Sequence, residues 1–174
     1  MTGGPALGAM LNGLRVVLID DSRSFLARVK EIIEHQRCIV LAFTDAREAM
    51  KAIPSFDADI IITDYEMPDL TGLQVIHELR KNSDLKAVPI LMLTSRDDTE
   101  SLVEATLAGA DALIVKSEVR QKLLPSLLAL TRLRSLQKEV VRLKQFSAIK
   151  AMMSTYKHEF GNVLAILDGK VKKL

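Results

Sequence analysis

The chain has 174 residues, of which 48% are hydrophobic, 24 are basic and 22 are acidic, and it contains a single cysteine. This length allows one domain of ordinary size plus an appendage. One cysteine excludes an internal disulfide and fits a reducing compartment, and no apolar run is long enough to insert into a membrane. We therefore expect a cytoplasmic protein, in which residues 1–12, with their glycines and proline, form a loose leader instead of a secretion signal.

Four short apolar runs in the first 116 residues are each followed by a polar side chain. Runs this apolar are typical of parallel strands that are covered on both faces. The carboxyl ends of such strands meet at one edge of the sheet, where ligands bind in open α/β sheets. The runs and the polar residues that follow them are 14–19 with Asp20 and Asp21, 59–63 with Asp64, 88–93 with Thr94, and 112–115 with Lys116.

Helical patterns separate these runs. Apolar residues recur at helical spacing at Phe25, Val29 and Ile33, and again at Val75 and Leu79. Alternating strands and helices predict a parallel sheet with helices on both sides and right-handed crossovers. The expected fold class is therefore α/β, with a five-stranded, doubly wound parallel sheet of flavodoxin-like type.

The predicted edge carries three carboxylates, a hydroxyl and an ammonium group. Three converging carboxylates repel one another and stay ionised only beside a counter-charge. An all-oxygen cluster suits a hard divalent cation such as Mg2+, and Lys116 would supply the remaining positive charge. A carboxylate can attack a phosphoryl group to give a mixed anhydride, while a metal ion and a lysine meet the charge on the transferring oxygens. These residue types therefore indicate phosphoryl chemistry.

The motifs also follow the order of one signalling family. They are the acidic pair Asp20-Asp21, the D-x-x-M-P-x-x-x-G segment from Asp64 to Gly72, the strand-end Thr94, the turn Gly109-Ala110-Asp111, and Lys116. Over roughly residues 14–130 the chain resembles the receiver domain of two-component response regulators, and we assign residues 13–130 to such a domain.

The resemblance implies a role for each residue at the edge. The phosphoryl group would be accepted by Asp64, hydrogen-bonded by Thr94 and paired with Lys116. The donor would be a histidine kinase or a phosphotransfer protein. Mg2+ would be held by Asp64, directly by Asp21, through water by Asp20, and by the main-chain carbonyl of Glu66.

The chain departs from the family pattern at two positions. Ser117 follows Lys116 where the family usually has a proline, and Leu113 occupies the place of the usual aromatic residue in the last strand. The sequence therefore favours phosphorylation, but it does not predict the usual readout in which an aromatic ring turns inward behind the strand-end hydroxyl.

A long helix is expected from Val119 onward, because no glycine occurs before Gly161. An apolar stripe along it predicts pairing with the same helix of a second chain, so residues 131–174 are expected to form a parallel homodimeric coiled coil. The segment after Lys116 holds 12 basic and 4 acidic residues, but it shows no helix-turn-helix pattern and nucleic-acid binding is not favoured. The stripe is Leu133, Leu136, Val140, Leu143, Phe146, Ile149, Met153, Tyr156, Phe160, Val163 and Leu167.

A second motif lies within this helix, from His158 to Leu164. It resembles the H-box of histidine kinases, in which His158 would be a phosphoacceptor and Glu159 would hold its proton. The sequence has no ATP-binding domain, so we expect a phosphoacceptor switch and not an enzyme. The alternative is that the chain is the N-terminal part of a receiver–histidine kinase hybrid.

Overall fold

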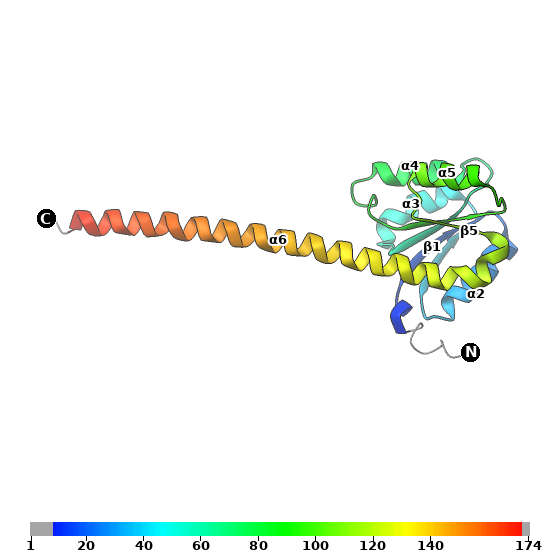
Figure 1. The fold of residues 1–174 in the computed structure, drawn as a ribbon, viewed down its shortest axis with the longest axis horizontal. Coiled ribbons are helices and arrows are strands. Elements are labelled where there is room, and N and C mark those ends of the chain that lie inside the picture. Colours follow the sequence, from blue (N-terminus) through cyan, green and yellow to red (C-terminus); the bar gives the residue numbers. More distant parts are fainter. Residues whose placement is uncertain (1–8, 172–174) are drawn as a thin grey trace. The chain divides into compact units, whose positions relative to one another are not determined.

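The computed structural model describes the backbone of residues 9–171, together with their side chains except Ala151 and those from Ser154 onward. Its centre is one sheet of five parallel strands in the order β2-β1-β3-β4-β5 (Figure 1). This confirms the predicted doubly wound α/β fold. The strands are β1 Arg15–Ile19, β2 Ile39–Phe43, β3 Ile60–Asp64, β4 Ile90–Thr94 and β5 Ala112–Val115.

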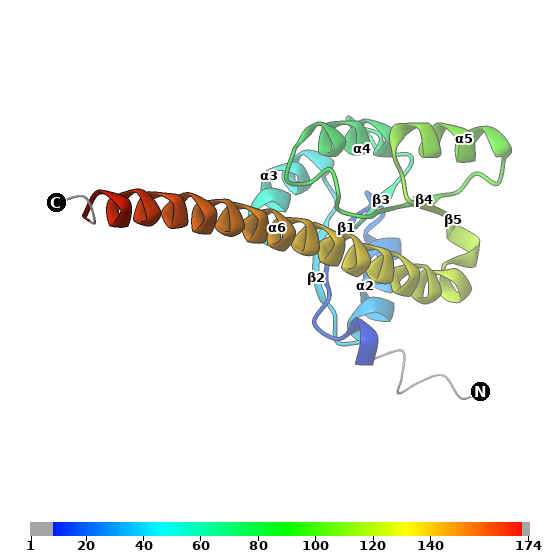
Figure 2. The ribbon, with the colours of Figure 1, turned by 60° about the vertical axis from the view of Figure 1, so that its left-hand side comes forward.

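Helices cover both faces of the sheet (Figure 2). On one face, α2 and the first turns of α6 pack against the strands through Phe25, Val29, Leu123 and Leu127. On the other face lie α3, α4 and α5. The helices are α2 Arg23–Glu34, α3 Ala46–Phe56, α4 Gly72–Lys81, α5 Thr99–Ala108, the short 3-10 helix η1 Lys116–Glu118, and α6 Val119–Val171.

The sequence explains where several elements begin. Ser22, Thr71 and Asp98 each cap a helix by accepting a hydrogen bond from a main-chain N–H of its first turn. β4 begins at Ile90 instead of Val88, because Pro89 has no N–H to give to the strand ladder. Lys116, in contrast, follows β5 directly as the first residue of η1.

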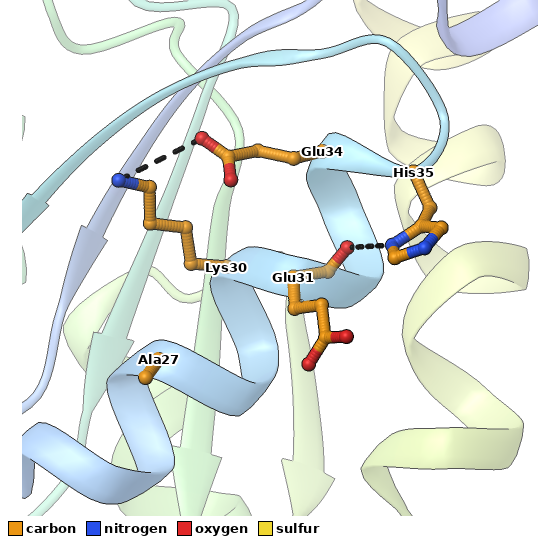
Figure 3. Close-up of a pocket in the computed structure, with 5 residues that line it drawn as sticks. All are labelled: Ala27, Lys30, Glu31, Glu34 and His35. Atoms are coloured by element: carbon orange, nitrogen blue, oxygen red, sulfur yellow. Dashed lines mark hydrogen bonds and ion pairs between the residues drawn. The ribbon is translucent and has the colours of Figure 1, made fainter.

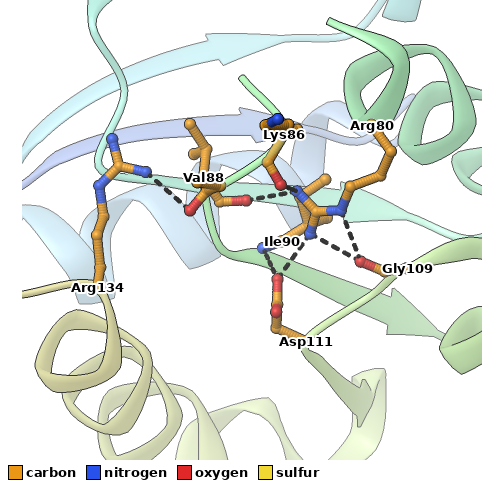
Figure 4. Close-up of polar contacts among 8 residues, drawn as sticks. Arg80, Lys86, Val88, Ile90, Gly109, Asp111 and Arg134 are labelled. Atoms are coloured by element: carbon orange, nitrogen blue, oxygen red, sulfur yellow. Dashed lines mark hydrogen bonds and ion pairs between the residues drawn. The ribbon is translucent and has the colours of Figure 1, made fainter. Parts of the chain in front are cut away.

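An arginine network joins α4, β4 and the turn before β5 (Figure 4). Arg80 donates hydrogen bonds to the main-chain oxygens of Lys86, Val88 and Gly109, and it lies 2.7 Å from Asp111. The same Asp111 oxygen accepts a hydrogen bond from the Ile90 N–H. This network fixes the amino end of β4 opposite the edge that carries the polar strand ends.

The chain divides into one unit that ends at Arg134 and a second that begins at Ser135. Within the first unit, Leu127 and Leu130 of α6 are buried, whereas Leu133 is 56% exposed. Arg134 donates hydrogen bonds to the main-chain oxygens of Ala58 and Ala87, which ties this part of α6 to the loops before β3 and β4. Among the described residues, no helix is both long and apolar enough to cross a membrane.

Candidate functional site

The carboxyl edge of the sheet carries five of the predicted residues. Asp20 follows β1, Asp64 ends β3, Thr94 ends β4 and Lys116 follows β5. The Lys116 Nζ lies 2.8 Å from an oxygen of Asp64 and 2.8 Å from an oxygen of Asp20. The ligand atoms of Asp20, Asp21 and Asp64 all lie within 4.8 Å of one another. One ammonium group thus faces a cluster of three carboxylates.

Short main-chain contacts seat Asp64 at the end of its strand. The Tyr65 N–H donates to the Leu93 oxygen, and the Gly72 N–H donates to the Tyr65 oxygen. A Cβ atom at Gly72 would lie 2.1 Å from the main-chain oxygen of Asp64, so only glycine allows this close approach. Gly72 therefore closes the loop of the D-x-x-M-P-x-x-x-G segment against the strand that carries Asp64.

Burial and charge set the ionisation of the site. The pKa of Asp64 is raised to about 6, because burial, helped by the nearby Asp20, outweighs the lowering effect of Lys116. Burial alone would lower the pKa of Lys116, but its contacts with Asp20 and Asp64 outweigh this and raise the pKa. At neutral pH Lys116 is charged, and Asp64 is mostly ionised and available as a nucleophile.

The site has the charge and donor atoms of a divalent-cation site. Three carboxylates and one ammonium leave two negative charges, which a divalent cation would balance. Asp20 is fully buried, and among the described residues its Oδ2 has the Lys116 ammonium as its partner, at 2.8 Å. A buried oxygen with free lone pairs among carboxylates fits a hard ion such as Mg2+. Glu66 has an exposed side chain and lies in the loop after β3, beside this cluster in sequence.

Two histidines belong to helical segments and not to the strand ends. His35 is exposed at the end of α2, where its Nδ1 lies 2.7 Å from the Glu31 main-chain oxygen. It lines a hollow whose other residues all belong to the same helix (Figure 3). His158 lies in α6, but its side chain is outside the described residues. Its role as a phosphoacceptor therefore stays a prediction.

Sequence reasoning gave no role to a set of side chains beside the site. The Tyr65 side chain is buried, and its hydroxyl donates to the carboxylate of Glu104 on α5. This contact raises the pKa of Tyr65. The Arg96 guanidinium lies 5.7 Å from the centre of the Tyr65 ring. The only sequence signal was the position of Tyr65 directly after Asp64.

Comparison with known proteins identifies the family. The family model for the response regulator receiver domain matches residues 16–128, and the chain belongs to this family. It is 29% identical over 118 residues to the protein PilG of Pseudomonas aeruginosa, a match that covers 68% of this chain and 87% of PilG. It is 30% identical over 115 residues to the chemotaxis protein CheY-3 of Vibrio cholerae, covering 62% of this chain and 85% of CheY-3.

A solved structure agrees with these relatives. The structure of the chemotaxis protein CheY4 of Vibrio cholerae is similar with a TM-score of 0.65 and 31% identity, covering 68% of this chain and 98% of that one. The predicted response-regulator receiver is thereby confirmed as the class of protein. The region matched by the family model ends before most of α6.

Proposed function

We propose that this receiver is a phosphorylation-dependent switch in which Asp64 accepts the phosphoryl group. The observation that carries the proposal is the contact of Lys116 with Asp64 at 2.8 Å, beside two further carboxylates at the same edge. A nucleophile, a counter-charge and a metal-binding set thus come from three different strand ends. No other arrangement of titratable side chains among the described residues offers this combination.

The proposed reaction transfers a phosphoryl group to a carboxylate. An Asp64 oxygen attacks phosphorus and forms a mixed anhydride, while the bond from phosphorus to the donor breaks and the donor keeps the electron pair. The donor is the phosphohistidine of a histidine kinase or a phosphotransfer protein, or a small phosphodonor such as acetyl phosphate. Lys116 would then pair with the phosphoryl oxygens, and the Thr94 hydroxyl would donate a hydrogen bond to one of them.

Mg2+ is the proposed cofactor, because the donor set and the excess negative charge both suit it. Asp21 and Asp64 would bind it directly, Asp20 through water, and the Glu66 main-chain carbonyl would complete the set. A bound divalent cation stabilises the charge that develops on the transferring oxygens. Lys116, at 2.8 Å, holds the Asp64 carboxylate in a position from which it can react.

The second part of the proposal concerns α6. Between Leu133 and Met153 this helix carries a stripe of apolar side chains that are each at least half exposed, and a second copy of the same helix is the proposed occupant. The steps of the stripe alternate between three and four residues except for a run of threes around Phe146, which overwinds a two-stranded coiled coil without ending it. The described members are Leu133 56%, Leu136 64%, Val140 51%, Leu143 58%, Phe146 68%, Ile149 55% and Met153 68% exposed.

Charges beside the stripe favour a parallel pair. With Val140 at heptad position a and Leu143 at d, Glu139 is at g and Lys144 is at the following e. In a parallel, in-register pair a g residue lies beside the following e residue of the other chain. Glu139 of each copy would therefore face Lys144 of the other, which gives two such pairs in the dimer. In an antiparallel pair g positions lie beside g positions and e beside e, so Glu139 would not face Lys144 of the second copy.

The alternative proposal gives His158 a role. If the chain is the N-terminal part of a receiver–histidine kinase hybrid, His158 is its phosphoacceptor, and Asp64 receives phosphate from a separate histidine. The resemblance of residues 158–164 to an H-box favours this alternative. It is tested by supplying a cognate kinase and mapping the phosphate: acid-labile, base-stable label on the tail supports it, and its absence in both wild type and His158→Ala opposes it.

The central proposal is tested by incubating the full chain with acetyl phosphate and Mg2+ and measuring its intact mass. We expect one added phosphoryl group, which peptide mapping locates at Asp64.

A further inference from the structure

A chain of contacts leads from the end of β4 to the start of α5. The Thr94 hydroxyl oxygen accepts a hydrogen bond from the Arg96 N–H at 3.0 Å. The Arg96 side chain lies over the Tyr65 ring and pairs with Asp98 at 3.1 Å. Asp98 in turn caps α5, because its oxygens accept from the N–H and the hydroxyl of Ser101 at 2.7 Å and 3.1 Å.

A second path starts at Asp64 itself. Tyr65 is the next residue, and its main chain is fixed between the Leu93 oxygen and the Gly72 N–H. Its buried ring reaches α5, where the hydroxyl donates to Glu104. Arg96 lies over this ring, so the two paths meet at one pair of side chains. Both paths end on α5, one at its cap and one at its second turn.

Leu113 cannot link the strand-end site to α5 through hydrogen bonds in the way that Tyr65 and Arg96 do. It is partly buried on β5 and packs in the apolar cluster under α3, α4 and α5. Its side chain has no polar atom, so it cannot hydrogen-bond the Thr94 hydroxyl or a carboxylate on α5. In this chain the aromatic ring next to Asp64 comes from β3 and not from β5.

We propose that Arg96 and Tyr65 transmit the state of Asp64 to helix α5. The inference rests on the proposed phosphorylation of Asp64 and names the residues that read it out. When the Thr94 hydroxyl turns toward a phosphoryl group on Asp64, the Arg96 N–H loses its acceptor. Arg96 then leaves the Tyr65 ring and Asp98, which loosens the cap of α5 and the contact of Tyr65 with Glu104. Helix α5 presents the exposed side chains of Leu102, Val103 and Leu107, so its movement changes the surface of the receiver.

Amide hydrogen exchange across residues 99–108 of the full chain tests the proposal. Phosphorylation with acetyl phosphate and Mg2+ should speed exchange in α5 by about fivefold, the factor that corresponds to the loss of one hydrogen bond. Arg96→Ala, which keeps the N–H to Thr94 but removes the guanidinium, and Tyr65→Phe, which removes only the hydroxyl, should each abolish most of this response. Leu113→Val is the matched control and should keep it.

Intact mass is measured on the same samples, so a failure of phosphorylation is distinguished from a failure of transmission. The proposal is overturned if Arg96→Ala and Tyr65→Phe are phosphorylated like wild type and keep the full response of α5. It is also overturned if Leu113→Val alone removes the response.

Tyrosine fluorescence provides a second measurement, in which Tyr65, Arg96 and Glu104 are all kept. The chain has two tyrosines and no tryptophan, so Tyr156→Phe leaves Tyr65 as the only tyrosine. A carboxylate that accepts from a tyrosine hydroxyl quenches its emission. We expect emission to rise on phosphorylation in this variant and to stay constant in Tyr156→Phe with Asp64→Asn. Constant emission in a variant whose mass shows full phosphorylation contradicts the proposal.

Discussion

Lys116 lies 2.8 Å from Asp64, and the same nitrogen lies 2.8 Å from Asp20, so one ammonium group serves two buried carboxylates. Burial, together with this shortage of positive charge, explains why the pKa of Asp64 rises to about 6 from 3.8. The same shortage of positive charge leaves the site with an excess of negative charge that suits a divalent cation. The chemistry and the stability of the receiver are therefore linked at Asp64.

The first prediction concerns the dependence of stability on pH. Because the pKa of Asp64 is raised in the folded state, the stability that its protonated form contributes is full below pH 3.8 and is lost as the pH rises to about 6. The shift corresponds to at most about 3 kcal/mol. In metal-free buffer, Asp64→Asn should be about 1–3 kcal/mol more stable than wild type at neutral pH. Urea unfolding measures this difference.

The same comparison near the lower end of this range is the control. Close to about pH 4 the two proteins should have nearly equal free energies of unfolding, because Asp64 is then largely protonated in the folded state. Adding Mg2+ at neutral pH should stabilise wild type more than Asp64→Asn. Equal stability of the two proteins at both pH values would refute the linkage.

The second prediction concerns the Arg80 network. Arg80→Ala should lower the free energy of unfolding by about 2–3 kcal/mol, since it leaves the main-chain oxygens of Lys86, Val88 and Gly109 without this donor and removes the ion pair with Asp111. Arg47→Ala is the matched control on α3, because Arg47 is exposed, and it should change stability by less than about 0.5 kcal/mol. Denaturant unfolding measures the free energy of unfolding of both variants. Similar losses of stability in the two would contradict the proposed role of the Arg80 network.

The third prediction uses two adjacent valines of α6. Val140 and Val141 are 51% and 54% exposed, but only Val140 belongs to the apolar stripe. Val140→Lys should convert the proposed dimer to monomer, whereas Val141→Lys should leave it dimeric. Light scattering over a concentration series measures both. If the intact chain is monomeric at high micromolar concentration, the coiled coil is excluded.

The fourth prediction tests the parallel arrangement. Glu139→Lys should weaken the dimer, because it brings two ammonium groups together across the interface, and Lys144→Glu should weaken it by a similar amount by pairing two carboxylates. The double variant Glu139→Lys/Lys144→Glu should restore the dimer, as measured by light scattering. In an antiparallel pair Glu139 and Lys144 do not face each other, so the double variant would not restore what the single variants lose.

The sequence was sufficient to locate four of the five strands and the edge at which they end, but not β2, whose residues are only partly buried or exposed. Each buried run is apolar along most of its length and is followed by a polar residue, so the place of Asp64 and Lys116 follows from local pattern. Contacts that join distant segments could not be predicted in this way. Tyr65 and Glu104 are 39 residues apart, and nothing in either segment specifies the other.

The helix α6 shows the same limit. Its apolar residues recur from Leu123 to Met153, and the sequence assigned those up to residue 130 to the receiver and those from Leu133 onward to a pairing stripe. Leu130 is buried and Leu133 is exposed. The residues of the sheet and of α2 that bury Leu123 and Leu127 come from distant segments, so these contacts could not be predicted from the helix alone.

The central claim is that Asp64 accepts phosphate with the help of Mg2+, and intact mass spectrometry tests it most directly. Wild type, Asp64→Asn and Asp21→Asn are incubated with acetyl phosphate, with Mg2+ or with EDTA. We expect one phosphoryl group on wild type with Mg2+ and almost none with EDTA, reduced uptake by Asp21→Asn, and none by Asp64→Asn. Equal uptake by wild type and Asp64→Asn would contradict the account.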